Sequence, residues 1–238
     1  MAGESWRLLL FGASGAIGQA IAQHALARGW AVLGVTRSAV PPVDSAGMSW
    51  MRYDPLTDAT FPGSGDDRFD AVCWAQGANM ADSLNAFDAD RHLELYRANC
   101  LSVLAGAAAL VAGQRLRVGG ARLVIISSIW QERARQDKLS YTVTKAAIGG
   151  VVRSASVDLG ADGHLINGVL PGVMDTPMTA ANLSLEQLQI VRDRTTLGRL
   201  PDVATLSDLV LFLCSSGNNS ITGQSVAVDL GMSNANLL

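Results

Sequence analysis

The sequence predicts a three-layer α/β fold, in which helices cover both faces of one doubly wound parallel sheet. Strand-like and helix-like segments alternate along its 238 residues, which is typical of parallel strands joined by right-handed crossovers. Hydrophobic residues make up 49% of the chain and charged residues only 16%, as expected when strands are buried on both faces. A glycine-rich turn at residues 12–18 follows the first strand, where such folds bind phosphate groups.

Short apolar, β-branched runs predict seven strands. These strands are residues 6–11, 31–36, 48–53, 69–74, 122–126, 165–170 and 225–229. Three helices are also predicted, at residues 17–28, 88–114 and 146–159; the first is rich in alanine and stops at Gly29. There is no internal repeat and no linker, so we expect residues 1–238 to form a single domain.

Three polar side chains are expected to converge after the strand at residues 122–126. Ser128 follows the carboxyl end of that strand, where open parallel sheets bind ligands. Tyr141 and Lys145 are four residues apart and would share one face of a helix. A serine, a tyrosine and a lysine at this edge can carry out proton chemistry on a carbonyl or an alcohol.

The residue types suit that chemistry. A free tyrosine has a pKa of about 10, and a nearby ammonium lowers it toward the working pH, where acid–base catalysis is most efficient. The hydroxyl of Ser128 can hydrogen-bond a substrate oxygen as charge develops. The alternative is an ordinary helix pair beside a serine that merely ends a strand. Taken alone the pair would favour that alternative, but the other motifs of the chain reverse it.

The turn from Gly12 to Gly18 predicts a pyrophosphate site. Glycines allow the backbone to approach phosphates, and the following helix offers free N–H groups and its positive dipole end. After the second strand the chain continues with Arg37 and Ser38, without the acidic residue that NAD-binding proteins usually place there. Arg37 can pair with a ribose phosphate and Ser14 can add a hydroxyl, so we expect NADP(H). Arg37 could instead be a solvated surface residue, although the missing acid still argues against NAD.

Together these motifs resemble the short-chain dehydrogenase/reductase family, in its smaller single-domain type with a Rossmann-like fold. The resemblance covers nearly the whole chain, and the matching pieces occur in the family's order. They are Gly12 to Gly18, Asp54, Ala75-Gln76-Gly77, Asn99, Ser128, Tyr141 with Lys145, Pro171-Gly172, Thr176-Pro177-Met178, Ile221-Thr222-Gly223-Gln224 and Asp229.

The resemblance implies four catalytic residues. Tyr141 would be the general acid–base, and Lys145 would lower its pKa and hold the nicotinamide ribose. Ser128 would polarise the substrate carbonyl, and Asn99 would anchor a water molecule that passes protons to Lys145.

The resemblance also implies a cofactor site for NADP(H). Asp54 would contact the adenine, while the backbone of Val173 and the hydroxyl of Thr176 would hold the carboxamide. The implied cofactor-binding residues are Gly12, Ser14, Gly15, Ala16, Ile17, Gly18, Arg37, Ser38, Asp54, Ala75, Gln76, Gly77, Tyr141, Lys145, Pro171, Gly172, Val173 and Thr176.

The chain departs from the family pattern at a few cofactor positions. Phe11 stands where threonine is frequent, Ala16 replaces the middle glycine, and Ala75 replaces an asparagine that usually ties strands together. Leu230 stands in a place where glycine is common. These departures concern cofactor geometry and leave the proton chemistry untouched.

Two segments are expected to border the substrate. The loop at residues 129–140 contains Trp130, which could form an apolar wall, and Arg133 and Arg135, which could meet a carboxylate or phosphate. It could equally be a solvated loop or a subunit contact. Residues 173–200 form the predicted lid, whose apolar side chains would exclude water.

Composition narrows the remaining partners. The net charge of −3 and the lack of a basic patch argue against nucleic acid. Three widely spaced cysteines form neither a disulfide framework nor a metal pattern, and His24, His92 and His164 are scattered, so we expect no metal site. Neither a signal peptide nor a membrane-spanning run is evident, so we expect a cytoplasmic protein with no membrane partner.

The sequence therefore favours an NADP-dependent ketoreductase that acts on a small polar or acyl-type ketone or secondary alcohol. The alternatives are a 3-oxoacyl-thioester reductase, a non-catalytic NADP-binding regulatory protein, or, less favoured, a lyase or epimerase. Runs of small residues in the helix around residues 101–110 and in the helix containing Tyr141 match surfaces that relatives use to form dimers and tetramers. The resemblance thus implies a homo-oligomer, and we expect a homotetramer.

Overall fold

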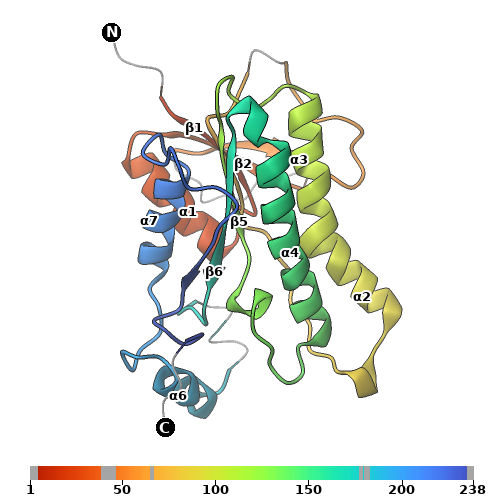
Figure 1. The fold of residues 1–238 in the computed structure, drawn as a ribbon, viewed down its shortest axis with the longest axis vertical. Helices are drawn as coiled ribbons and strands as arrows, with labels where there is room; N and C mark the ends of the chain where they lie inside the picture. Colours follow the sequence, from red (N-terminus) through yellow and green to blue (C-terminus); the bar gives the residue numbers. More distant parts are fainter. Residues whose placement is uncertain (1–4, 39–46, 65–66, 177–178, 180–182, 235–238) are drawn as a thin grey trace.

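Seven parallel strands form one sheet in the order β3-β2-β1-β4-β5-β6-β7 (Figure 1). The computed structural model describes residues 5–38, 47–64, 67–176, 179 and 183–234. The chain starts at the centre of the sheet, winds outward to β3, returns to β4 beside β1, and then winds to β7. The doubly wound α/β architecture predicted from the sequence is therefore confirmed.

The strands lie close to their predicted positions. Their bounds are β1 Arg7–Phe11, β2 Ala31–Thr36, β3 Ser49–Arg52, β4 Ala71–Trp74, β5 Arg122–Ile126, β6 Leu165–Pro171 and β7 Ser225–Val228. β4 begins two residues later than predicted, because Phe69 pairs with Leu116 in an isolated bridge outside the strand. The central strands are almost wholly buried, as expected for a sheet covered on both faces.

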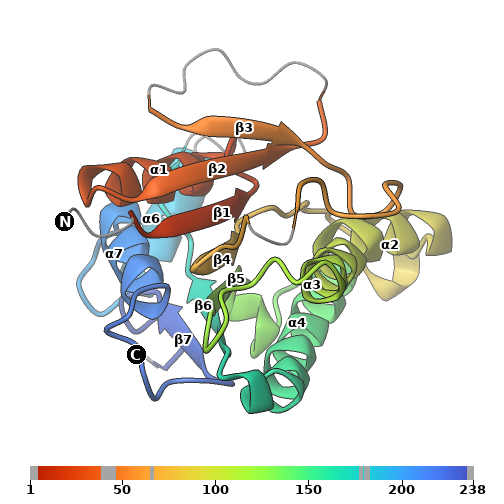
Figure 2. The ribbon, with the colours of Figure 1, turned by 90° about the horizontal axis from the view of Figure 1, so that it is seen from above.

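Helices cover the two faces of the sheet (Figure 2). On one face lie α1 (Ala16–Ala27) and α7 (Val203–Leu213), and on the other lie α2 (Ala89–Tyr96), α3 (Ser102–Ala112) and α4 (Leu139–Asp158). α6 (Leu185–Asp193) lies beyond the carboxyl ends of the strands, at the bottom of Figure 1. Each layer has its own buried core. One core contains Leu10, Ile21 and Val210, and the other contains Trp74, Leu123 and Ile148. Cys73, Cys100 and Cys214 are buried and unpaired within these cores, as expected.

The long predicted helix at residues 88–114 is interrupted by a wider turn. α2 and α3 are joined by the π-helical turn η2, Arg97–Leu101, and such turns are frequent at functional sites. Residues 89–112 are long and apolar enough to cross a membrane by length and composition, with a mean hydropathy of 1.5. This segment lies on one face of the sheet, and 33% of its most apolar window is buried inside the molecule.

α4 begins seven residues before the predicted start. It runs from Leu139, so Tyr141 and Lys145 both lie in its first two turns. Its early start is stabilised from outside the helix, because the carboxylate of Asp82 accepts hydrogen bonds from the backbone N–H and the hydroxyl of Ser140. A carboxylate near a helix N-terminus also interacts favourably with the helix dipole. No signal within residues 139–145 themselves reveals this support.

The far edge of the sheet is held by a buried asparagine. Asn167 in β6 donates to the carbonyl of Ile221 and accepts from the N–H of Gln224. These bonds hold the segment before β7 against β6 and so place Asp229 beside Gly172, where a side chain on the glycine would lie only 2.9 Å from Asp229.

Candidate active site

The candidate site lies at the carboxyl edge of the sheet, where the chain leaves β1, β4, β5 and β6. The segments that follow these strands carry Gly12, Gln76, Ser128 and Gly172. β1, β4, β5 and β6 are consecutive neighbours in the sheet, so their ends necessarily lie side by side. The topology thus brings together groups that are up to 160 residues apart in the chain.

Ser128 is positioned by the end of β5. Its backbone is extended and its side chain is 93% buried, with an exposed fraction of 7%. Its hydroxyl oxygen accepts a hydrogen bond from the N–H of Trp130 at 3.3 Å, which caps the short helix η3, Ile129–Gln131. The oxygen therefore has a fixed position, while its proton stays available for another acceptor.

Lys145 lies beneath the phenol ring of Tyr141. Its ammonium donates to the carbonyl of Ile126 at 3.3 Å and lies 5.7 Å from the ring centroid of Tyr141. Burial lowers the pKa of Lys145 to about 8, and the nearby Cys100 raises it slightly. The lysine can therefore change its charge within the physiological range of pH.

Tyr141 experiences opposing influences on its acidity. Burial raises the pKa of the phenol above its usual value, because it disfavours the phenolate, and a hydrogen bond with the hydroxyl of Ser128 lowers it in part. Positive charge near the ring would favour the phenolate further. Burial and the hydrogen bond of Ser128 thus act on the acidity of Tyr141 in opposite directions.

Asn99 connects three elements of the site. Its side-chain oxygen accepts from the N–H of Ala78 at 2.7 Å, and its amide group donates to the carbonyl of Ala78 and to the hydroxyl of Thr144, both at 3.0 Å. The residue is 2% exposed and lies in the π-helical turn η2. The side chain therefore joins the loop after β4 to α4, and the predicted role in anchoring a water molecule stays a prediction.

The same loop closely approaches the lysine. A side chain on Gly77 would lie 3.6 Å from both the Asn99 side-chain oxygen and the Lys145 ammonium. Thr144 and Ala78, which complete this contact, were not singled out by the sequence. Thr144 lies directly before Lys145, but a threonine inside a helix is too common to indicate a function.

The glycine-rich turn has the geometry that a pyrophosphate site requires. Gly12 has a φ of +72°, and a side chain there would meet the backbone N–H of Gln76 at 2.4 Å. A side chain on Gly18 would meet the carbonyl of Gly12 at 2.2 Å. α1 begins at Ala16, directly after Gly15, so the replacement of the middle glycine by Ala16 leaves the helix start intact.

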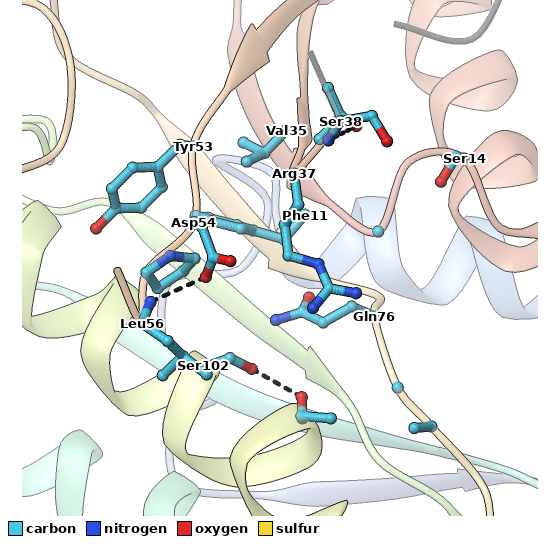
Figure 3. A pocket seen from close by; sticks show the side chains of 16 residues that line it. Phe11, Ser14, Val35, Arg37, Ser38, Tyr53, Asp54, Leu56, Gln76 and Ser102 are labelled. Atoms are coloured by element: carbon cyan, nitrogen blue, oxygen red, sulfur yellow. Dashed lines mark hydrogen bonds between the residues drawn. The ribbon is translucent and has the colours of Figure 1, made fainter. Parts of the chain in front are cut away.

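A cavity of about 280 Å³ opens beside this turn (Figure 3). Arg37 points into it from the end of β2, and Asp54 faces it from the loop after β3. The side-chain oxygen of Gln76 is buried, and no hydrogen-bond partner for it occurs in the described residues. Of the predicted cofactor residues, those lining this cavity are Gly12, Ser14, Arg37, Ser38, Asp54, Gln76 and Gly77.

The cavity fits the adenosine half of a dinucleotide. Its floor is backbone that approaches closely at glycines, its rim carries one arginine, and it holds a buried acceptor without a partner in the described residues. Gly15, Ile17 and Ala75 adjoin this region without lining the cavity, and Pro171 lies farther along the sheet edge, at the end of β6. Asp54 also accepts from the N–H of Leu56 at 3.0 Å, so it orders its own loop as well.

A second cleft, of about 830 Å³, lies on the other side of the Ser128 segment. It is lined by Trp130, Arg133 and Arg135 from the loop before α4, by Val173 after β6, and by apolar side chains of α6. The two predicted substrate segments therefore face each other across one cleft. Thr176 shares a hydrogen bond with Thr179, and Pro177 and Met178 lie outside the described residues.

The three histidines lie in separate environments. His24 contacts Asp208, His92 contacts Ser140, and His164 accepts from the N–H of Ala121. Within the residues that the structure describes, no group of three or more histidine, cysteine or carboxylate side chains could hold a metal ion.

Comparison with known proteins identifies the family. The sequence profile described as "Enoyl-(Acyl carrier protein) reductase" matches residues 65–233, well over half of the chain. The chain belongs to the short-chain dehydrogenase/reductase family. This family accounts for the order of motifs in the sequence.

Individual relatives and solved structures agree with this assignment. The chain is 36% identical over 111 residues to the 3-oxoacyl-[acyl-carrier-protein] reductase FabG of Aquifex aeolicus, covering 47% of this chain and 44% of that protein. The chain spans about half the length of the curated relatives that it matches. The aldohexose dehydrogenase of Thermoplasma acidophilum has the same fold, with a TM-score of 0.84 and 19% identity over 98% of this chain and 96% of that one. The structure of ElxO with NADP bound has a TM-score of 0.83 and 20% identity over 97% and 100% of the two chains.

Asn99→Ala should destabilise the site and leave the overall fold intact. The change leaves the backbone N–H and carbonyl of Ala78 without their side-chain partner and removes one donor from the hydroxyl of Thr144. We therefore expect the free energy of unfolding to fall by about 1–3 kcal/mol. Urea denaturation measures this loss, and amide hydrogen exchange at residues 77–83 should increase. The control is Asn219→Ala, which changes an exposed asparagine at a distance from the site. Equal stability of the two variants would contradict the connecting role of Asn99.

Proposed function

We propose that this protein is an NADP(H)-dependent oxidoreductase that reduces a ketone to a secondary alcohol. The observation that carries the proposal is the closeness of Ser128, Tyr141 and Lys145 at the carboxyl edge of the sheet. Their neighbours line the two cavities, since Gly77 beside Lys145 lines the first and Ile129 after Ser128 lines the second. The bound nicotinamide would supply or accept the hydride. The residues of this chain would orient the substrate, exclude water and move the proton.

Tyr141 is proposed to exchange the proton with the substrate oxygen. In the reducing direction its phenol donates, so activity requires the protonated form and declines as pH rises through the pKa of Tyr141. In the oxidising direction the phenolate accepts, so activity appears as pH rises through the same pKa. Ser128 would donate a hydrogen bond to the developing oxyanion, and Lys145 would stabilise the phenolate.

Arg37 supports the choice of NADP(H) over NAD(H). It extends from β2 into the adenosine cavity, and no carboxylate ends β2 to repel a ribose phosphate. A guanidinium can bind a phosphate with two parallel hydrogen bonds. Asp54, the carboxylate lining this cavity, belongs to the loop after β3 and already accepts from Leu56.

The large cleft bounds the substrate class. Its walls combine Trp130 and Ile190 with the guanidinium groups of Arg133, Arg135 and Arg194, and none of these arginines forms an ion pair within the described residues. A ketone with a polar or anionic group, or an acyl thioester, would suit these walls. The FabG relative favours testing 3-oxoacyl thioesters beside small polar ketones. Within the predicted lid, we propose that residues 183–194 cover this cleft.

Exposed apolar side chains support a homo-oligomer. Leu101, Leu104 and Val111 on the η2–α3 helix, and Val143 and Val157 on α4, are 40–79% exposed. These helices lie side by side on one face of the molecule (Figures 1 and 2). We propose a homotetramer in a reducing, cytoplasmic setting, without nucleic acid or membrane partners.

The first prediction concerns Tyr141→Phe. Loss of the phenolic proton should reduce ketone turnover with NADPH by about 10²–10⁴-fold, while NADPH affinity changes by less than about tenfold, the value of one hydrogen bond. Absorbance at 340 nm against a ketone panel measures turnover, and fluorescence titration measures binding. Tyr96→Phe, the same chemical change on α2, is the control. Tight NADPH binding without turnover on any ketone by the unaltered protein would favour the regulatory alternative.

The second prediction concerns Arg37→Ser. Removing the guanidinium should raise the KM for NADPH by about 10–100-fold, as expected for one charge-assisted phosphate contact, with little change in the KM for NADH. Arg133→Ser, at the substrate cleft, serves as the matched control and should leave the cofactor ratio unchanged. A preference for NADH in the unaltered protein would show that the assignment of Arg37 is wrong.

The third prediction concerns assembly. Sedimentation velocity of the unaltered protein at micromolar concentration should give a single species with the mass of four chains. Val157→Asp together with Leu104→Asp should shift it to smaller species, because buried carboxylates oppose association. A monomer in the unaltered protein would contradict the proposed assembly.

A further inference from the structure

The chain contains only two lysines, and both lie beside Tyr141. Of its 18 basic residues, Lys138 and Lys145 are the two lysines and all others are arginines. The ammonium of Lys138 lies 5.9 Å from the ring centroid of Tyr141, and that of Lys145 lies 5.7 Å from the same point. The chain thus uses arginine for every other basic side chain and a lysine at the two positions that flank this phenol.

Lys138 is held in place by neutral groups. It occupies the N-cap position of α4, and its carbonyl accepts from the N–H of Thr142. Its ammonium donates to the side-chain oxygen of Asn79 at 2.8 Å and to the carbonyl of Met80 at 3.1 Å. Within the described residues neither lysine takes part in an ion pair. The positive charge of Lys138 is therefore fixed beside the phenol and not cancelled by a paired carboxylate.

We propose that Lys138 is a second cationic partner of Tyr141, which acts through the phenol and favours its ionised form during proton transfer. Lys138 acts only through its charge on the phenol and does not itself exchange the proton. It is therefore a positioning residue and not a catalytic one. The inference rests on the proposed function of Tyr141, which it deepens. It explains how a phenol that burial makes less acidic can still exchange a proton.

The two lysines differ in how strongly pH affects their charge. Lys145 is fully buried and its pKa is lowered to about 8, so its charge fades as pH rises above that value. Lys138 is only partly buried, and Asp82 and Asp137 counteract the lowering of its pKa by burial and by Arg135. The second lysine would extend the pH range over which a cation accompanies the phenol.

The other charged groups around this site are accounted for. The carboxylate of Asp82 is occupied by the N–H and hydroxyl of Ser140, and His92 contacts the same hydroxyl. Tyr141 faces Ser128 and Lys145. Lys138 faces Asp82, Asp137 and Arg135. Cys100 acts through Lys145, and His92 contacts Ser140.

The test compares Lys138→Met with Asn79→Asp. The first removes the charge, and the second keeps the lysine and its hydrogen bond but adds a carboxylate that cancels the charge. Asn79 is exposed, so the isosteric change is compatible with folding. Lys138 is only partly buried, so its charge, about 6 Å from the ring centroid, should shift the pKa of Tyr141 by about one unit. Both variants should therefore raise that pKa by about one unit. Lys138→Arg keeps a positive charge, so it should leave the pKa of Tyr141 close to its value in the unaltered protein.

Two measurements report the shift. The chain has three tyrosines, so labelling with [13Cζ]tyrosine gives three NMR resonances, and Tyr141→Phe identifies the one of interest. Titration with NADP+ present yields the pKa of Tyr141 without any turnover. In kinetics, the pH at which alcohol oxidation appears should rise by the same amount, and reduction should persist to higher pH.

The outcomes separate an electrostatic role from a structural one. If Lys138 only tied residues 79–80 to α4, Asn79→Asp would preserve that tie and leave the pKa of Tyr141 unchanged. An unchanged pKa in Asn79→Asp, or in both variants, would therefore overturn the proposal. Because the NMR titration needs no substrate, it remains decisive even if no ketone or alcohol is turned over, which would count against the proposed function alone.

Discussion

The hydrogen bonds of Asn99 are the contact on which the candidate site depends. One side chain joins the loop after β4 to the helix that carries Tyr141 and Lys145. The sheet alone aligns only strand ends, and the apolar packing of α4 on it, through residues such as Ile148, is non-directional and leaves the exact position of the helix free. Directional bonds at both ends of a buried amide remove that freedom. The π-helical turn η2 serves this contact, because it changes the helical phase at the residue that must face α4.

A buried proton-transfer site must balance two requirements. Exclusion of water strengthens each electrostatic interaction, but burial also raises the pKa of Tyr141 and lowers that of Lys145. With the lysine alone, the phenolate and the ammonium would both be disfavoured by the same desolvation. Neutral partners resolve part of this conflict, because the Ile126 carbonyl near Lys145 and the Asn79 and Met80 oxygens near Lys138 stabilise cations without neutralising them. The positive charges of the two lysines therefore remain available to act on the phenol of Tyr141.

The sequence predicts the fold and most of the candidate site because both depend on local patterns. β5 is a continuous apolar run and the glycine turn follows β1 directly, so periodicity and glycine placement suffice. The start of α4 was predicted seven residues late, because its first turn is capped by Asp82 from a distant loop. Thr144 and Lys138 were likewise not assigned roles, since their importance arises only when the loop after β4 folds against α4. Residue spacing predicts which side chains are neighbours on the same helix or strand. It does not predict contacts with residues of a different element.

The link from Asp82 through Ser140 to His92 shows how other elements of the fold fix the position of Tyr141. Ser140 has one hydroxyl proton, which it donates to Asp82 at 2.5 Å. The contact of 2.8 Å between the same oxygen and Nδ1 of His92 therefore requires His92 to be the donor. One serine hydroxyl thus ties the first turn of α4 both to the loop that carries Asp82 and to α2, which carries His92. Tyr141 directly follows Ser140, so its position is set by contacts from two other elements and not by the helix alone.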